Sequence, residues 1–145
     1  MAAEPWLRRF LLATALVTYL ASAVELFLVD HYEEWQQILP FVMIGVGGLA
    51  AAWAWASPGP PSLRAARWAG VLSAVTALAG VYFHVEGNLG FAQEVRPDAG
   101  GLDLAWGAVS GVSPFLAPGM IALAGVLAAA ATYRHPAWGG VDRAS

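Results

Sequence analysis

Four apolar runs, each about 20 residues long, take up most of this chain and leave little of it for a soluble fold. A helix of about 20 apolar residues crosses the hydrocarbon core of a bilayer, where backbone groups must be bonded within the spanning segment. The sequence therefore predicts an all-α integral membrane protein, folded as one domain over residues 1–145 into a four-helix transmembrane bundle. The approximate spans are 10–29, 38–56, 68–85 and 114–133.

Composition supports this class and excludes several others. Hydrophobic residues make up 59% of the chain and charged residues 12%, against about 25% charged in a soluble domain. The chain has no Cys, which excludes disulfides, thiolate metal sites and Cys nucleophiles. It has no Lys, its seven basic residues are scattered Arg, and its net charge is -3. A nucleic-acid partner is therefore excluded, whereas the lipid bilayer is an expected partner.

The positions of the Arg residues predict the orientation. With the N-terminus inside, six of the seven Arg fall on the inner side and Arg96 on the outer side, as the positive-inside rule requires. We therefore expect a multi-pass protein of the cytoplasmic (inner) membrane with both termini in the cytoplasm. The outer side then carries most of the acidic residues.

The first run has an alternative interpretation as a signal peptide. Arg8 and Arg9 would form its basic start, and the stretch Ala21-Ser22-Ala23 its cleavage site. We favour a span, because the apolar run continues past this site to about the 20 residues that a bilayer needs.

Two connections differ in length. Residues 57–62 contain three Pro and one Gly, so we expect a tight loop that breaks the helix. Residues 86–113 form a long outer loop between spans three and four, in which residues 104–112 could form a short interfacial helix. Connections longer than about 12 to 15 residues usually have a function.

Polar residues on the first and third spans follow helical spacing. On the first span they form one stripe that contains Glu25, and because a charge within lipid belongs on a protein-facing side, we expect Glu25 to face inward. On the third span an equivalent stripe consists of Ser73, Ala77, Gly80, His84, Gly87 and Asn88. We therefore expect spans one and three to be in contact, with His84 and Glu25 facing one site.

These residues suggest a site for a transition metal. Imidazole and carboxylate ligands suit Zn, Fe, Mn or Cu(II), and helical bundles build such sites from facing helices. The candidate ligands are Glu25, His31, His84 and Glu94, with Asp30 and Glu86 as alternates. No H-x-x-x-H or E-x-x-H pair is present, so the pattern is not specific.

Two alternatives to a metal site remain open. Haem ligation by His31 and His84 is geometrically allowed, but the sequence favours a metal ion, because both His lie near the ends of their spans rather than inside the bundle. The cluster could instead be structural, with Glu25 hydrogen-bonded to His84 and fixing helix packing.

The chain resembles small uncharacterised bacterial four-span membrane proteins. The resemblance lies in Glu25, His31 and Tyr32, which form Glu-x5-His-Tyr at the end of span one, in His84 at the end of span three, and in Ala117-Pro118-Gly119. It implies the four-span topology and the same choice of residues, but no activity.

The sequence thus leaves three functions open, of which a carrier is the least favoured, and names no reaction. One is an inner-membrane protein with an outer-facing His/carboxylate site for metal binding or redox chemistry. Another is a non-catalytic subunit that packs against other membrane subunits or further copies of itself. A carrier is disfavoured, because spans two and four contain no charged residue.

Overall fold

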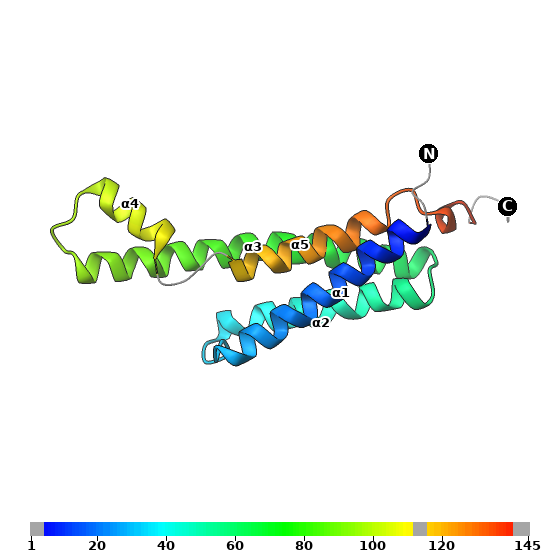
Figure 1. Cartoon of the computed structure of the whole chain (residues 1–145), viewed down its shortest axis with the longest axis horizontal. Helices are drawn as coiled ribbons and strands as arrows, with labels where there is room; N and C mark the ends of the chain where they lie inside the picture. Colours follow the sequence, from blue (N-terminus) through cyan, green and yellow to red (C-terminus); the bar gives the residue numbers. More distant parts are fainter. Residues whose placement is uncertain (1–4, 112–115, 141–145) are drawn as a thin grey trace.

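The computed structural model describes residues 5–111 and 116–140, which are helical apart from short connections and contain no β-strand. Four helices lie side by side, with the two ends of the described chain close together at one end of the bundle (Figure 1). The helices are α1 (Pro5–Leu28), α2 (Trp35–Ala56), α3 (Pro60–Val95), α4 (Gly101–Ser110) and α5 (Leu116–Ala131), followed by the short 3-10 helix η1 (Pro136–Gly140).

Three of these helices, α1, α2 and α3, are long and apolar enough to cross a membrane. The prediction of an all-helical membrane protein is confirmed at this level. The fourth predicted run, 114–133, corresponds to α5, an apolar helix of 16 residues. The helices that contain the other three predicted spans begin before them, α1 at Pro5, α2 at Trp35 and α3 at Pro60.

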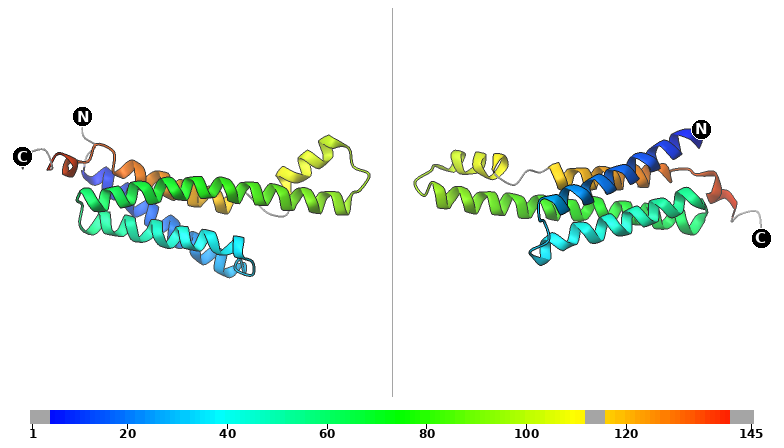
Figure 2. Two further views of the ribbon diagram at one scale, coloured as in Figure 1. Left: turned by 180° about the vertical axis from the view of Figure 1, so that it is seen from behind. Right: turned by 60° about the horizontal axis from the view of Figure 1, so that its bottom comes forward.

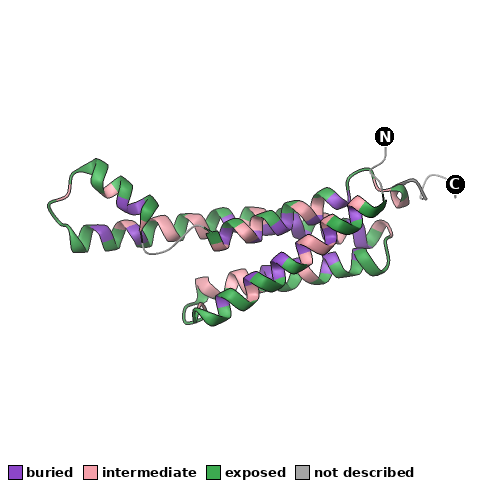
Figure 3. Ribbon diagram, in the orientation of Figure 1, coloured by how far each residue is buried: buried purple, intermediate pink, exposed green. Residues whose placement is uncertain are grey.

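The four bundle helices pack in the cyclic order α1, α2, α3, α5, so that each contacts the next and α5 closes against α1. α1 and α3 therefore lie diagonally across the bundle rather than side by side. The contact predicted between them is present at the centre of the bundle, where the buried Tyr19 hydroxyl donates to Ser73 Oγ at 3.0 Å. Buried residues concentrate where the four helices meet (Figure 3).

Glycine positions explain this order. A Cβ at Gly70 of α3 would overlap the carbonyl of Gly125 of α5, and a Cβ at Gly125 would overlap the carbonyl of Gly70. These two backbones therefore approach closely, as small residues allow in membrane helices, and α5 takes the place beside α3. Gly47 of α2 receives the Tyr19 ring in the same way, whereas Gly45 and Gly48 face open space.

The loop predicted over residues 57–62 is shorter than expected. Pro60 and Pro61 occupy the first turn of α3, where a missing N–H costs nothing because those N–H groups have no intrahelical acceptor. Ser62 Oγ accepts from Gly59 N–H and donates to the Ser57 carbonyl at 2.7 Å. The turn therefore needs only residues 57–59.

The described part of the long outer loop predicted over residues 86–113, residues 86–111, is mostly helical, and residues 112 and 113 lie outside the described residues. α3 continues to Val95, and α4 then folds back along it to form a hairpin that projects beyond the rest of the bundle (Figure 2). Small residues hold the pair together, since a Cβ at Gly107 would lie 2.9 Å from that of Ala92. Buried Asn88 donates to the Ala108 carbonyl at 3.3 Å. The expected short helix at 104–112 is thus α4, over residues 101–110.

Charges separate along the bundle. One end, which we call the arginine end, carries five of the six described Arg: Arg8, Arg9, Arg64, Arg67 and Arg134. All eight described carboxylate residues lie at or beyond the opposite end, which we call the acidic end: Glu25, Asp30, Glu33, Glu34, Glu86, Glu94, Asp98 and Asp103.

The arginine end also fixes the C-terminus of α5. The guanidinium of Arg8, which is buried, donates to the carbonyls of Ala131, Tyr133 and Arg134 at 2.8 to 2.9 Å. Arg67 donates to Thr132 and lies over the Trp138 ring at 4.9 Å. The last carbonyls of a helix lack intrahelical donors and carry partial negative charge, so these two cations stabilise the helix end.

Candidate functional site

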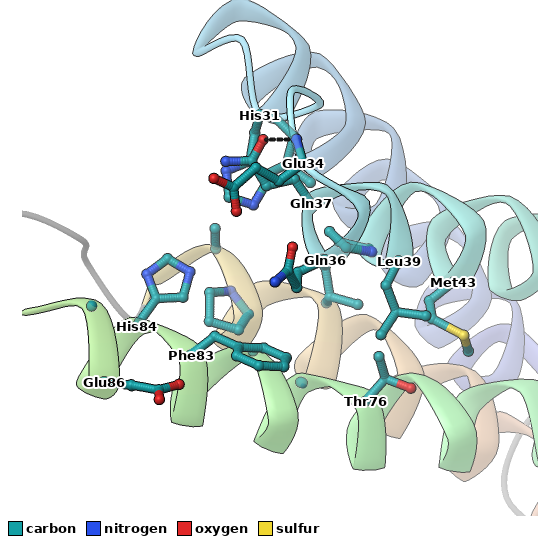
Figure 4. Close-up of a pocket in the computed structure, with 18 residues that line it drawn as sticks. His31, Glu34, Gln36, Gln37, Leu39, Met43, Thr76, Phe83, His84 and Glu86 are labelled. Atoms are coloured by element: carbon teal, nitrogen blue, oxygen red, sulfur yellow. Dashed lines mark hydrogen bonds between the residues drawn. The ribbon is translucent and has the colours of Figure 1, made fainter.

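A cavity of about 370 Å³ lies at the acidic end, between the α1–α2 turn, the start of α2, the middle of α3 and the start of α5. Its polar lining comes from the α1–α2 region and from α3, whose side chains face each other across it (Figure 4). Much of the remaining wall is apolar: Leu26, Leu39, Pro40, Met43, Ala77, Phe83, Ala117, Pro118 and Ile121. An apolar cavity with a few convergent polar groups is the usual form of a small-molecule site.

The end of α1 places His31 in this cavity. Asp30 has a left-handed backbone with φ 53°, and it donates its N–H to the Phe27 carbonyl while His31 N–H bonds to that of Leu26. This pair of bonds is the Schellman ending, which turns the chain back over its own helix. The imidazole of His31 is therefore half-buried and lines the cavity.

At the start of α2, two adjacent Gln side chains point in different directions. Gln37 Oε1 accepts from the N–H groups of Glu33 and Glu34 at 2.7 and 3.1 Å, which fixes the turn. Gln36 instead points into the space between α2 and α3 (Figure 4). Pro40, four residues later, has no N–H to bond the Gln36 carbonyl, so that carbonyl lacks its usual helical donor.

His84 lies across the cavity from His31. It belongs to the α3 stripe predicted from sequence, whose members Ser73, Ala77 and Asn88 are buried. The two imidazole rings have centroids 6.3 Å apart and planes 17° apart. His84 Nδ1 and Gln36 Oε1 are buried and have no hydrogen-bond partner among the described residues. Because buried polar atoms are nearly always paired, two unpaired ones in one cavity indicate a ligand site.

The electrostatics of the cavity favour neutral imidazole at His31. Burial lowers the pKa of His31, and the nearby His84 lowers it further. Two carboxylate residues, Glu34 and Glu86, also belong to the lining, which contains no Arg or Lys. The site is therefore rich in hydrogen-bond acceptors and carries negative charge at neutral pH.

The structure brings together two of the four predicted ligands. His31 and His84 share the cavity, but Glu25 is exposed on α1. Glu94 lies in the last turn of α3, ten residues beyond His84, which is about 15 Å along a helix. The expectation that Glu25 faces inward is wrong, because the buried stripe of α1 continues from Ser22 to Leu26, and Glu25 falls beside it.

The two alternate ligands, Asp30 and Glu86, also lie in different places. Glu86 lines the cavity, whereas Asp30 is exposed and accepts from the Tyr32 hydroxyl at 2.7 Å, a bond that raises the pKa of Tyr32. Within residues 5–111 and 116–140 no group of three or more His, Asp or Glu is placed to hold a metal ion. These residues therefore do not support the predicted metal centre, and haem ligation stays a prediction.

Sequence reasoning missed Gln36 as a site residue. The second span was predicted to begin at Ile38, so Gln36 was assigned to the connection before it. The sequence feature that could have indicated Gln36 is its position four residues before Pro40 in an otherwise apolar helix. A proline there removes one helical hydrogen bond.

Comparison of the chain with known protein families, curated proteins and solved structures finds no match in any of the three.

Proposed function

We propose that the protein is a four-span protein of the inner membrane, in which α5 is the fourth span and both termini are cytoplasmic. The support is the position of five Arg at one end of the bundle, since basic residues favour the cytoplasmic side. The 16 residues of α5 extend about 24 Å, which is about four fifths of the roughly 30 Å thickness of a bilayer core.

Reporter fusions test this topology. A reporter that works only in the cytoplasm should be active when fused after Ser145 or at Ser62. A reporter that works only outside the membrane should be active at Asp98. An external signal at Ser62 would contradict the proposed orientation.

We further propose that the cavity at the acidic end binds an amphipathic amine, with its apolar body against the apolar wall and its ammonium group at the polar end. The single observation that carries this proposal is the pair of buried, unpartnered atoms, Gln36 Oε1 and His84 Nδ1, in one cavity.

The chemistry of the lining selects the head group. Gln36 offers its side-chain oxygen and its backbone carbonyl, and His84 Nδ1 can accept when the ring carries its single proton on Nε2. Glu34 and Glu86 add negative charge without a basic residue in the lining. An ammonium group donates up to three hydrogen bonds and carries the complementary charge, whereas a carboxylate or phosphate would meet like charge.

Matched probes test the amine assignment. Phenethylamine, phenethyl alcohol and hydrocinnamate share a benzene ring and a short chain, but carry a cationic, a neutral and an anionic head. With the purified protein in a neutral detergent, the rise in melting temperature on ligand addition should follow the order amine, alcohol, carboxylate.

Two variants sharpen that experiment. Gln36→Leu removes an acceptor and Glu34→Gln removes a charge, so both should reduce the response to the amine. Glu94→Gln, outside the cavity, should leave it unchanged. An equal response to all three probes, or a preference for the carboxylate, would contradict the proposal.

The second candidate function is a packing subunit of a larger membrane complex. The α4 face that points away from α3 supports it, because Leu102, Trp106 and Val109 are all exposed and their spacing places them on one stripe. Replacing the three by Ser should then reduce the size of the assembly extracted from native membranes with mild detergent. An unchanged size would count against this candidate.

A further inference from the structure

A second cavity, of about 320 Å³, lies at the arginine end and is separate from the proposed amine site. It opens between the first turns of α1, the end of α2, the start of α3 and the residues that follow α5. Its polar lining consists of Arg8, Arg9, Thr132 and His135, and it includes no carboxylate. The apolar lining is Pro5, Leu12, Ala54, Trp55, Ala56, Pro58, Leu63, Ala131 and Pro136.

The cationic groups of this cavity have different roles. Arg8 is held by the α5 carbonyls, so its position is fixed while its positive charge remains. Arg9, the next residue, is exposed at the rim. Both charges lie far from the described carboxylates, which are at or beyond the acidic end. The cavity therefore has a positive potential that no nearby described carboxylate offsets.

His135 adds a neutral hydrogen-bond donor. Its Nδ1 accepts from the Ala137 N–H at 3.1 Å, so the proton of the neutral ring is on Nε2. Burial lowers the pKa of His135, and the charge of Arg8 lowers it further. The exposed guanidinium of Arg9 and the imidazole N–H of His135, beside the fixed positive charge of Arg8, form a set of groups suited to a phosphate.

The apolar part of the lining distinguishes a lipid from a free anion. Leu12 and Leu63 are buried at the cavity, and Trp55 is exposed beside it at the end of α2. Trp is enriched where a span meets the head-group region, and basic pockets between spans on the cytoplasmic side bind anionic head groups. A phosphodiester with attached acyl chains can use both the cations and the apolar wall, whereas inorganic phosphate can use only the cations.

We propose that the cavity at the arginine end binds the phosphodiester head group of an anionic phospholipid, through Arg9 and His135 beside the fixed charge of Arg8. Its first acyl methylenes pack on the apolar wall near Trp55. The site holds one such lipid per chain.

Native mass spectrometry of the purified protein tests the proposal with two lipids that differ only in their heads. Phosphatidylglycerol and phosphatidylcholine with the same acyl chains are added separately, and the first binding event is measured. Wild-type protein should bind phosphatidylglycerol at least about fivefold more tightly, the contribution expected of one basic residue near an anionic head group.

The matched variants are Arg9→Gln and Arg64→Gln. Both remove one charge from an exposed position at the same end, but Arg64 does not line the cavity. Arg9→Gln should remove the preference for phosphatidylglycerol, and Arg64→Gln should retain it. Equal losses in both variants would mean that the lipid responds to general surface charge, and would overturn the proposal.

A competition arm separates the lipid from a free anion. Excess inorganic phosphate at constant ionic strength should not displace the bound phosphatidylglycerol, because it lacks the apolar contacts. Displacement by phosphate, or equal binding of the two lipids by wild-type protein, would overturn the assignment. Arg8 is left unchanged in these experiments because its loss would disturb the end of α5.

Discussion

The two ends of the bundle treat buried polar groups in opposite ways. At the arginine end, Arg8 and Arg67 donate to the carbonyls at and after the C-terminus of α5. At the acidic end, Gln36 Oε1 and His84 Nδ1 are buried without a partner. Paired groups of the first kind contribute stability. Unpaired groups of the second kind cost stability unless a water or a bound molecule satisfies them. This difference is the support for placing the proposed binding site at the acidic end.

The largest expected effect is from Arg8→Leu at the arginine end. This change leaves three carbonyls at the end of α5 without their donor, and breaking a buried network with a charged group should cost about 3 kcal/mol. The free energy of unfolding can be measured by titrating a denaturing detergent into the solubilised protein. Arg64→Leu, at an exposed position, should change it by less than about 0.5 kcal/mol. Similar losses in the two variants would show that Arg8 does not hold α5.

Gln36→Leu at the acidic end should change the free energy of unfolding in the opposite direction. The substitution removes a buried acceptor that has no donor in the ligand-free protein, so it should stabilise that protein by about 1 kcal/mol. The adjacent variant Gln37→Leu is the control, because it removes the acceptor of the Glu33 and Glu34 N–H groups. It should cost about 1 kcal/mol, as the loss of a helix cap does. Effects of the same sign in the two variants would contradict the proposed contrast.

The smallest expected effect is a dependence of stability on pH at His31. Its pKa is lowered in the folded protein, so between that pKa and the unfolded value of about 6.5 the unfolded chain binds more protons. Stability is therefore fully present above about pH 6.5 and is lost as the pH falls through this range. His31→Gln should flatten the profile of melting temperature between pH 7 and pH 5. Because the pKa of His135 is also lowered, a residual slope is expected, and the double variant with His135→Gln should remove it.

Local patterns in the sequence predicted much of the fold. They predicted only two of the four residues proposed to bind the amine, namely His84 and the alternate Glu86. Helical spacing placed Ser73, Ala77 and His84 on one face of α3, because the face of a helix repeats with a known period. The same reasoning failed for Glu25. From Ser22 the buried stripe could continue three residues on, at Glu25, or four residues on, at Leu26. The structure buries Leu26 and leaves Glu25 beside the stripe.

Long-range contacts account for what the sequence did not show. The sequence predicted a loop after Glu86, and Gly87 and Gly90 in this segment weaken a helix by about 1 kcal/mol each. The packing of α4 against Ala92 and Asn88 overrides that local preference. Gln36 could be recognised as a site residue only once its unpaired oxygen was located in the same cavity as His84.

The unbroken course of α3 makes it a lever with one pivot. The close contact of Gly70 with Gly125 is the point about which α3 would tilt. His84 lies 14 residues and Val95 lies 25 residues beyond it within the same helix, or about 21 Å and 38 Å at 1.5 Å per residue. If α3 tilts as a rigid rod about that contact, a lateral displacement at the tip of the hairpin moves the His84 wall of the cavity by a little over half as much. Mechanical load on the projecting hairpin would thereby alter the width of the cavity.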